Sequence, residues 1–146
     1  MIKFNDAILQ GDFVKAKELA SYMDTDTLGD TLFLLAYDHE NIATYGFISY
    51  LLLEEETSEL HYIASYLFSM AFNHLEGAYQ TSFHHAKKAV VLSPNNMSYK
   101  EYLLFFNDIP DKLLGNEEAF EIAKKFLKTN LITRLHYQLL VKQQIN

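Results

Sequence analysis

The apolar residues of this chain recur at intervals of three and four, the spacing that places side chains on one face of an α-helix. No stretch alternates between apolar and polar residues as a half-buried strand does. Glycine and proline are scarce, with 5 and 2 residues in a chain of 146, too few for the turns of a β-sandwich or barrel. The sequence therefore predicts an all-α protein. The clearest helical spacings are Phe13, Ala16, Leu19, Ala20 and Met23, then Tyr79, Phe83, Ala86, Ala89 and Val90, and finally Leu131, Leu135 and Leu139.

Glycines and capping residues divide this pattern into helices. A glycine just past an apolar run favours a helix end, because glycine readily takes the left-handed backbone conformation required there. Gly11, Gly77 and Gly115 stand in such places. Asp, Ser and Asn side chains accept hydrogen bonds from the free N–H groups at a helix start. We predict such caps at Asp12, Asp26, Ser58 and Asn96.

The predicted helices are joined by short loops, so neighbouring helices should pack antiparallel. No low-complexity linker divides the chain, and its length suits one domain. The helices are predicted over residues 2–10, 12–23, 27–38, 41–55, 59–75, 78–92, 97–107, 116–128 and 131–143.

Three stretches of the chain resemble one another. Each begins with a glycine turn, at Gly11, Gly77 or Gly115, and continues as a helix with small residues along one face. The glycines are 66 and 38 positions apart, near two repeats and one repeat of a unit of about 34 residues. This spacing predicts a further turn, without a glycine, near residues 39–41.

The repeat resembles the tetratricopeptide repeat (TPR) family, most closely over residues 65–96. The match has two departures in residue type, because Ser69 stands where the family has a glycine and Ser82 where it has an alanine. The turn between the two helices is also one residue longer than in the family. The resemblance implies helical hairpins stacked in a right-handed superhelix, with repeats at about 1–26, 27–60, 61–96 and 97–130 and a capping helix at 131–143. The positions that carry the match are Phe68, Ala71, Phe72, Gly77, Tyr79, Ala86, Ala89, Pro94, Asn95 and Asn96, with weaker matches at Gly11, Phe13, Ala16 and Ala20 and at Gly115, Ala119 and Ala123.

Charge is distributed unevenly along the chain. The net charge is −7, and neither Lys nor Arg occurs between Lys17 and Lys87. An acidic surface repels nucleic acid and anionic lipid and attracts a basic protein. Negative charge at a helix C-terminus is unfavourable, so helix stability does not explain the acidic run at 54–56. Solubility and partner docking both explain it, and the docking set we predict is Glu54, Glu55, Glu56 and Glu59.

In TPR proteins the first helix of each repeat lines a concave groove. The resemblance therefore implies a binding surface rich in Tyr, which adds contact area and a hydrogen bond at little entropic cost. In the third repeat the implied residues are Tyr66, Met70, Asn73 and His74. Analogous placement adds Asp30, Tyr37 and Asp38 in the second repeat and Tyr99 and Tyr102 in the fourth.

Motifs for catalysis or metal binding are missing. No Glu stands three residues before a His, HExxH does not occur, and no two glycines form a phosphate loop. The adjacent His84 and His85 diverge by about 100° on a helix, and we expect the histidines to be partly exposed. We therefore expect no enzyme, cofactor or metal. The alternative is a helical enzyme or metal-binding bundle that uses His74 with Glu76, or His61 with Glu59.

These features predict a protein-interaction module that binds a basic protein or peptide. An immunity or antitoxin protein and a small TPR chaperone like those of bacterial secretion systems both fit. We expect a cytoplasmic protein with no membrane partner, because no apolar run approaches the roughly 20 residues of a membrane span. We expect no nucleic-acid partner, because the acidic surface repels it. Self-association, for example as a homodimer, is a further alternative. A single Arg, Arg134, among many Lys is typical of AT-rich bacterial genomes.

Overall fold

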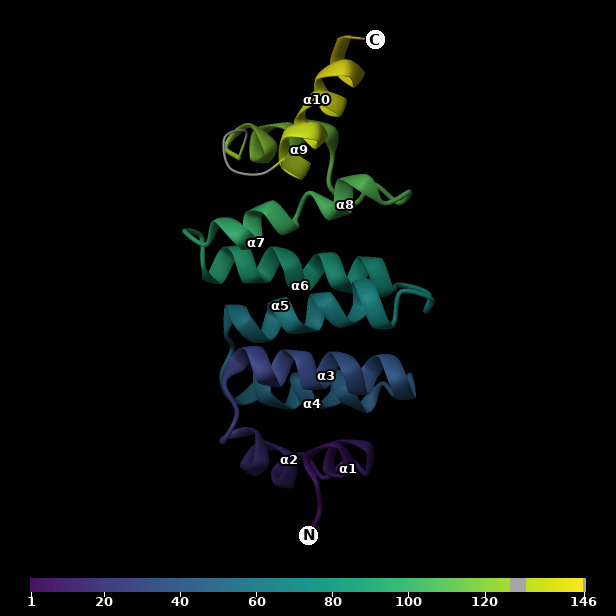
Figure 1. Ribbon diagram of the computed structural model, residues 1–146, viewed down its shortest axis with the longest axis vertical. Coiled ribbons are helices and arrows are strands. Elements are labelled where there is room, and N and C mark those ends of the chain that lie inside the picture. The colour runs from purple at the N-terminus through teal and green to yellow at the C-terminus, as the bar shows by residue number, and fades with distance from the viewer. Residues whose placement is uncertain (127–130, 146) are drawn as a thin grey trace. The chain divides into compact units, whose positions relative to one another are not determined.

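A computed structural model describes residues 1–126 and 131–145 of the chain (Figure 1). In this described part the regular structure is entirely helical and no strand occurs. The prediction of an all-α protein is therefore confirmed. The chain divides into two compact units, Met1–Leu92 and Ser93–Asn146. None of its described helices has the length and apolar character to cross a membrane.

The first unit is a succession of helices in which each contacts its neighbours. Contacts join α1 to α2 and α4, α4 to α5, and α3 to both α5 and η1, and the most extensive ones join α5 to α6. Its largest fully buried side chains include Ile8, Leu32, Phe47, Leu67 and Phe72. The elements are α1 (Phe4–Leu9), α2 (Phe13–Ala20), α3 (Thr25–His39), α4 (Ala43–Glu54), α5 (Ser58–Tyr66), the π-helix η1 (Leu67–Ala71) and α6 (Ala78–Leu92).

Two of the predicted N-caps are confirmed. The Asp12 carboxylate accepts the Lys15 backbone N–H at 3.0 Å, and the Asn96 side chain accepts the Tyr99 N–H at 3.2 Å. A side-chain acceptor in this place satisfies one of the N–H groups that a helix start leaves free. The two caps fix the starts of α2 and of α7 (Met97–Tyr102).

The other two predicted caps, Asp26 and Ser58, are wrong, because α3 and α5 begin earlier. Asp24 caps α3 by accepting the Thr27 N–H at 2.7 Å, and this bond lowers the pKa of the Asp24 carboxyl. Thr57 caps α5. Asp24 and Thr57 have the extended backbone that a cap requires, whereas Asp26 and Ser58 already lie inside the first turn.

Two of the three predicted glycine turns have the expected backbone, whereas Gly115 has φ of −67° and is the N-cap of α9. Gly11 and Gly77 have φ of 78° and 79°, in the left-handed region that favours glycine. The turn predicted near residues 39–41 is present, since α3 ends at His39 and Glu40 follows with φ of 48°.

The helix predicted over residues 59–75 ends early and changes type. It runs as α5 to Tyr66 and continues as the π-helix η1 to Ala71, after which residues 72–77 form a turn. Met70 follows Tyr66 at a spacing of four residues and is exposed. Ser69 is buried instead.

The second unit contains four helices in its described part. The single helix predicted over 97–107 is two short ones, with a hydrogen-bonded turn at Leu103 and Leu104 between them. The predicted helix at 116–128 ends at Lys124, and its last two predicted residues lie outside the described residues. The elements are α7 (Met97–Tyr102), α8 (Phe105–Asp108), α9 (Asn116–Lys124) and α10 (Leu131–Ile145).

A buried asparagine holds the second unit together. The Asn107 side-chain N–H group donates to the Leu114 carbonyl at 3.0 Å and to Asn116 Oδ1 at 2.8 Å. Its oxygen accepts a bond from His136 Nε2 at 3.0 Å. One side chain thus links α8, the approach to α9, and α10. The arrangement of both units as four repeats in one superhelix stays a prediction.

Candidate functional site

Four aromatic rings form a continuous row across α3 and α5. Phe33 stacks on Tyr37 with ring centroids 6.0 Å apart and contacts Tyr66 at 5.1 Å. Tyr66 in turn stacks on Tyr62 at 6.3 Å. The row therefore joins two helices that are separated by α4 in the sequence.

Helical spacing explains why these rings share a surface. On α3, Asp26, Asp30, Phe33 and Tyr37 follow one another at intervals of four, three and four. On α5 the same stripe consists of Glu59, Tyr62 and Tyr66, and η1 extends it to Met70. In both helices the acidic residue comes before the rings. We call this surface the aromatic–acidic face, made of Asp26, Asp30, Phe33, Tyr37, Glu59, Tyr62, Tyr66 and Met70.

This face is accessible to a partner. Tyr37 is 62% exposed and Met70 38% exposed, while Phe33 and Tyr66 are half-buried. Asp26, Asp30 and Glu59 are exposed, and neither α3 nor α5 contains Lys or Arg. The face thus offers apolar ring area beside negative charge. Such a combination suits a ligand with both a positive group and an apolar body.

The structure brings four of the predicted groove residues together on this face, namely Asp30, Tyr37, Tyr66 and Met70. Asp38 is exposed at the end of α3, and Asn73 and His74 are exposed in the turn after η1. Tyr99 and Tyr102 belong to the second unit, where the Tyr102 ring stacks on Phe105. Sequence reasoning missed Asp26, Phe33 and Tyr62, although their spacing from Asp30 and Tyr66 was the available signal.

The predicted acidic docking set is partly paired within the molecule. Glu54 forms an ion pair with Lys17, which lowers the pKa of the carboxyl and raises that of the amine. Glu56 accepts a bond from His61 Nε2 at 2.8 Å and lies 3.6 Å from Lys88 Nζ, and both contacts lower its pKa. These partners reduce the negative charge that this surface presents.

The other two members of the set differ in position. Glu55 is exposed after the end of α4, next to the paired Glu54. Glu59 accepts the Ser58 hydroxyl at 3.1 Å and stands at the start of the α5 stripe. Glu59 therefore belongs to both the predicted docking set and the aromatic–acidic face.

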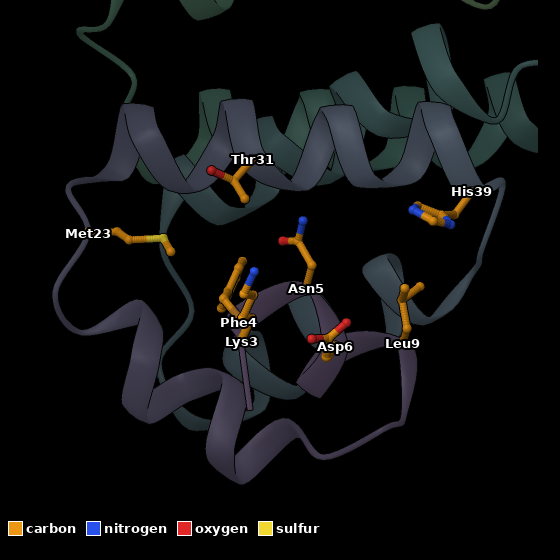
Figure 2. A pocket seen from close by; sticks show the side chains of 8 residues that line it. All are labelled: Lys3, Phe4, Asn5, Asp6, Leu9, Met23, Thr31 and His39. Carbon is orange, nitrogen blue, oxygen red and sulfur yellow. The ribbon is translucent and has the colours of Figure 1, made fainter. Parts of the chain in front are cut away.

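The first unit has cavities at its surface, of which two bear on the site. A cavity of about 420 Å³ is formed where α1 faces α3, and its lining mixes Lys3 and Asp6 with Met23 and Leu9 (Figure 2). A smaller one of about 280 Å³ lies beside the Lys17–Glu54 pair. Neither shows a set of polar groups directed at one ligand.

Three of the six histidines differ from the prediction of partial exposure, whereas His39, His74 and His84 are exposed. His61 and His85 are each 4% exposed and His136 is 7% exposed, because each has hydrogen-bond partners inside its unit. His61 bonds to Glu56 rather than Glu59, while His74 and Glu76 are exposed in a turn. In the part of the chain that the structure describes, no three His, Asp or Glu side chains are grouped to hold a metal ion.

Comparisons of this chain with protein families, with curated proteins and with solved structures find no match.

Proposed function

We propose that this protein is an interaction module and that its aromatic–acidic face binds a basic segment of a partner protein. The observation that carries the proposal is the parallel order of the two stripes. On each helix an exposed carboxylate precedes exposed or half-exposed rings, and the Phe33–Tyr66 contact at 5.1 Å joins the stripes into one surface.

The chemistry of the face favours a peptide-like ligand with Lys or Arg next to apolar residues. Aromatic rings contribute large contact area with few rotatable bonds, and their faces attract cations. The carboxylates of Asp26, Asp30 and Glu59 select positive charge, and the net charge of −7 speeds the approach of a basic partner. Anionic nucleic acid is a poor ligand for the same reason.

The TPR resemblance supports the same surface. If residues 27–60 and 61–96 are TPR-like repeats, α3 and α5 with η1 are their first helices, which line the groove in that family. The protein then acts by stable binding rather than turnover. A small chaperone that holds an extended segment fits this surface better than an immunity protein that docks through 54–56, since Glu54 and Glu56 have partners of their own.

Selection from a random peptide-display library tests the proposal. Peptides are selected on the wild-type protein and then tested against Asp26→Asn/Asp30→Asn/Glu59→Gln, which keeps the shape of the face and removes its charge. We expect the selected peptides to be rich in Lys or Arg beside aromatic or aliphatic residues. We expect their affinity for the variant to fall about tenfold, because three lost charge contacts at about 0.5 kcal/mol each amount to about 1.5 kcal/mol.

A matched variant controls for net charge. Glu40→Gln/Glu55→Gln/Glu76→Gln removes the same number of charges from exposed sites outside the face. It should weaken binding only slightly, through loss of long-range attraction. Two results would show that the face does not recognise a basic segment. One is a set of selected peptides without basic residues, and the other is an equal loss of peptide affinity in the two triple variants.

A further inference from the structure

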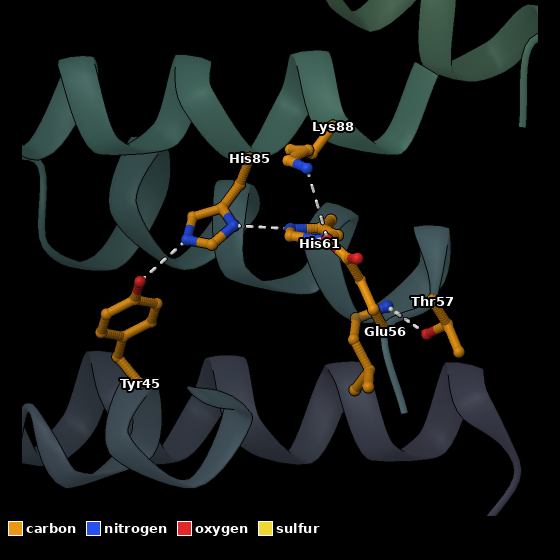
Figure 3. Close-up of polar contacts among 7 residues, drawn as sticks. Tyr45, Glu56, Thr57, His61, His85 and Lys88 are labelled. Atoms are coloured by element: carbon orange, nitrogen blue, oxygen red, sulfur yellow. Dashed lines mark hydrogen bonds and ion pairs between the residues drawn. The ribbon is translucent and has the colours of Figure 1, made fainter. Parts of the chain in front are cut away.

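A chain of polar side chains, with two buried histidines between a half-buried tyrosine and an exposed glutamate, links α4, α5 and α6 (Figure 3). The Tyr45 hydroxyl lies 2.8 Å from His85 Nε2, and His85 Nδ1 lies 2.8 Å from His61 Nδ1. His61 Nε2 lies 2.8 Å from Glu56 Oε1, which also meets Lys88. We call Tyr45, His85, His61 and Glu56 the histidine relay. It is separate from the aromatic–acidic face, and the inference below does not depend on the proposed binding function.

The partners fix where the hydrogens are. An ionised carboxylate only accepts, so His61 Nε2 carries a hydrogen and donates it to Glu56. In neutral His61 the Nδ1 atom is then an acceptor, and His85 Nδ1 must donate to it. His85 Nε2 is left as an acceptor for the Tyr45 hydroxyl. With both rings neutral, every hydrogen bond of the relay points toward Glu56.

One added proton can be held without losing a bond. If His61 becomes an imidazolium, its Nδ1–H donates to His85 Nδ1, and the hydrogen of His85 moves to Nε2. That Nε2–H then donates to the Tyr45 oxygen, which still leaves three hydrogen bonds. The new charge lies beside the Glu56 carboxylate at 2.8 Å.

A second proton cannot be held in this way. If both rings are protonated, two N–H donors and two positive charges face each other where His61 and His85 now form a 2.8 Å bond. The titratable groups that face His85 are Tyr45 from α4, His61 from α5 and the neighbouring His84 on α6, while η1 contributes no ionisable residue. None of these groups is a carboxylate, so nothing compensates a charge on His85.

We propose that the histidine relay is an acid-sensitive latch, which holds α5 against α6 while the two rings share at most one proton and opens this end of the hairpin when both are protonated. Burial, together with positive charge on His61 and His84, lowers the pKa of His85 from 6.5 to about 4. The unfolded chain therefore binds the extra proton more readily than the folded one. The stability that His85 provides is complete above about pH 6.5 and is lost as the pH falls toward 4.

The first test is the pH dependence of unfolding in urea for the full chain. Wild-type protein is compared with His85→Asn, which cannot titrate but can still donate to His61. His84→Asn is the matched control, since His84 is the exposed neighbour on the same helix. Between pH 6.5 and 4 we expect the folded-to-unfolded ratio of the wild type to fall at least about tenfold more than that of His85→Asn. His84→Asn should stay close to the wild type, because the charge of His84 is the smallest of the three causes that lower the pKa of His85. Equal slopes for all three proteins would overturn the latch.

The second test needs no variant and reads the hydrogens directly. Nitrogen chemical shifts of the histidine rings distinguish Nδ1–H, Nε2–H and doubly protonated forms in the wild-type protein. At pH 7.5 we expect His85 in the less common Nδ1–H form and His61 in the Nε2–H form. On acidification His85 should change to Nε2–H as His61 gains its proton. Finding His85 as Nε2–H at pH 7.5 would contradict the relay even if His85→Asn fails to fold.

Discussion

At the scale of single residues, the backbone conformation of Glu40 is a source of strain in the fold. Glu40 ends α3 in the left-handed region with φ of 48°, where a side chain with a Cβ atom is strained. Gly11 and Gly77 meet the same requirement in the equivalent turns without that strain. Glu40 therefore marks a place where the local sequence and the fold disagree.

Replacing Glu40 with glycine should stabilise the protein. The change removes the left-handed strain from the folded state. This gain is larger than the cost of the extra conformational entropy that glycine gives the unfolded chain, so we expect the free energy of unfolding to rise by about 0.5–1 kcal/mol. Thermal unfolding compared with Glu40→Gln checks this, because the Gln variant removes the charge at the helix C-terminus but keeps the strain. If Gly and Gln raise the melting temperature equally, charge rather than conformation is the cause.

Sequence alone could find the local contacts but not the distant ones. Asp12 and Asn96 cap the helices that directly follow them, so their role was readable from adjacent residues. The relay joins His85 to residues 24 and 40 positions away, and nothing near His85 in the sequence indicates those partners. His84 and His85 stand side by side in the chain, yet one is exposed and the other is 4% exposed.

At the scale of elements, periodicity located nearly every helix because burial of one face dominates helix stability. The predicted and observed bounds of α6 are the same, residues 78–92, because Gly77 directly precedes the helix and Pro94 follows shortly after its end. The π-helix η1 was not foreseen, since a single extra residue leaves no mark on a spacing of three and four. It matters for the site because it carries Met70, the last residue of the α5 stripe.

Enlarging Ala89 should destabilise the α5–α6 hairpin. Ala89 is 1% exposed on α6, whose closest neighbour is α5. Leucine there has no space, and we expect Ala89→Leu to cost about 1–3 kcal/mol. Chemical denaturation measures the cost, with Val91→Leu on the same helix as a control, because Val91 is exposed. A neutral Ala89→Leu would mean that the repeat register assigned to this helix is wrong.

At the scale of the whole molecule, the aromatic–acidic face and the histidine relay both lie in the unit Met1–Leu92. The unit Ser93–Asn146 has its own buried residues, such as Phe106, Leu114 and Leu140. Among these buried residues, Asn107 also forms hydrogen bonds to Leu114 and His136. The sequence marks this boundary with the loop residues Ser93, Pro94, Asn95 and Asn96, but so short a loop did not predict a division into two units.

Removing the Asn107 network should destabilise the second unit selectively. Asn107→Leu keeps the volume but leaves the His136 donor and the Leu114 carbonyl without this partner, at a cost of about 1–3 kcal/mol. Amide hydrogen exchange should then become faster in α9 and α10 than in α3 to α6, while the exposed-site control Asn95→Ala leaves both unchanged. Equal acceleration throughout the chain would show that the two units unfold together.

The most direct measurement for the whole account is amide chemical-shift mapping on the labelled full chain with a selected basic peptide. Binding at the aromatic–acidic face predicts the largest shifts at Asp30, Phe33, Tyr66 and Met70. The acidic run Glu54–Glu55–Glu56 should shift little. Shifts centred on that run or on the small cavity beside Lys17 and Glu54, with α3 unaffected, would contradict the assignment of this face as the binding surface.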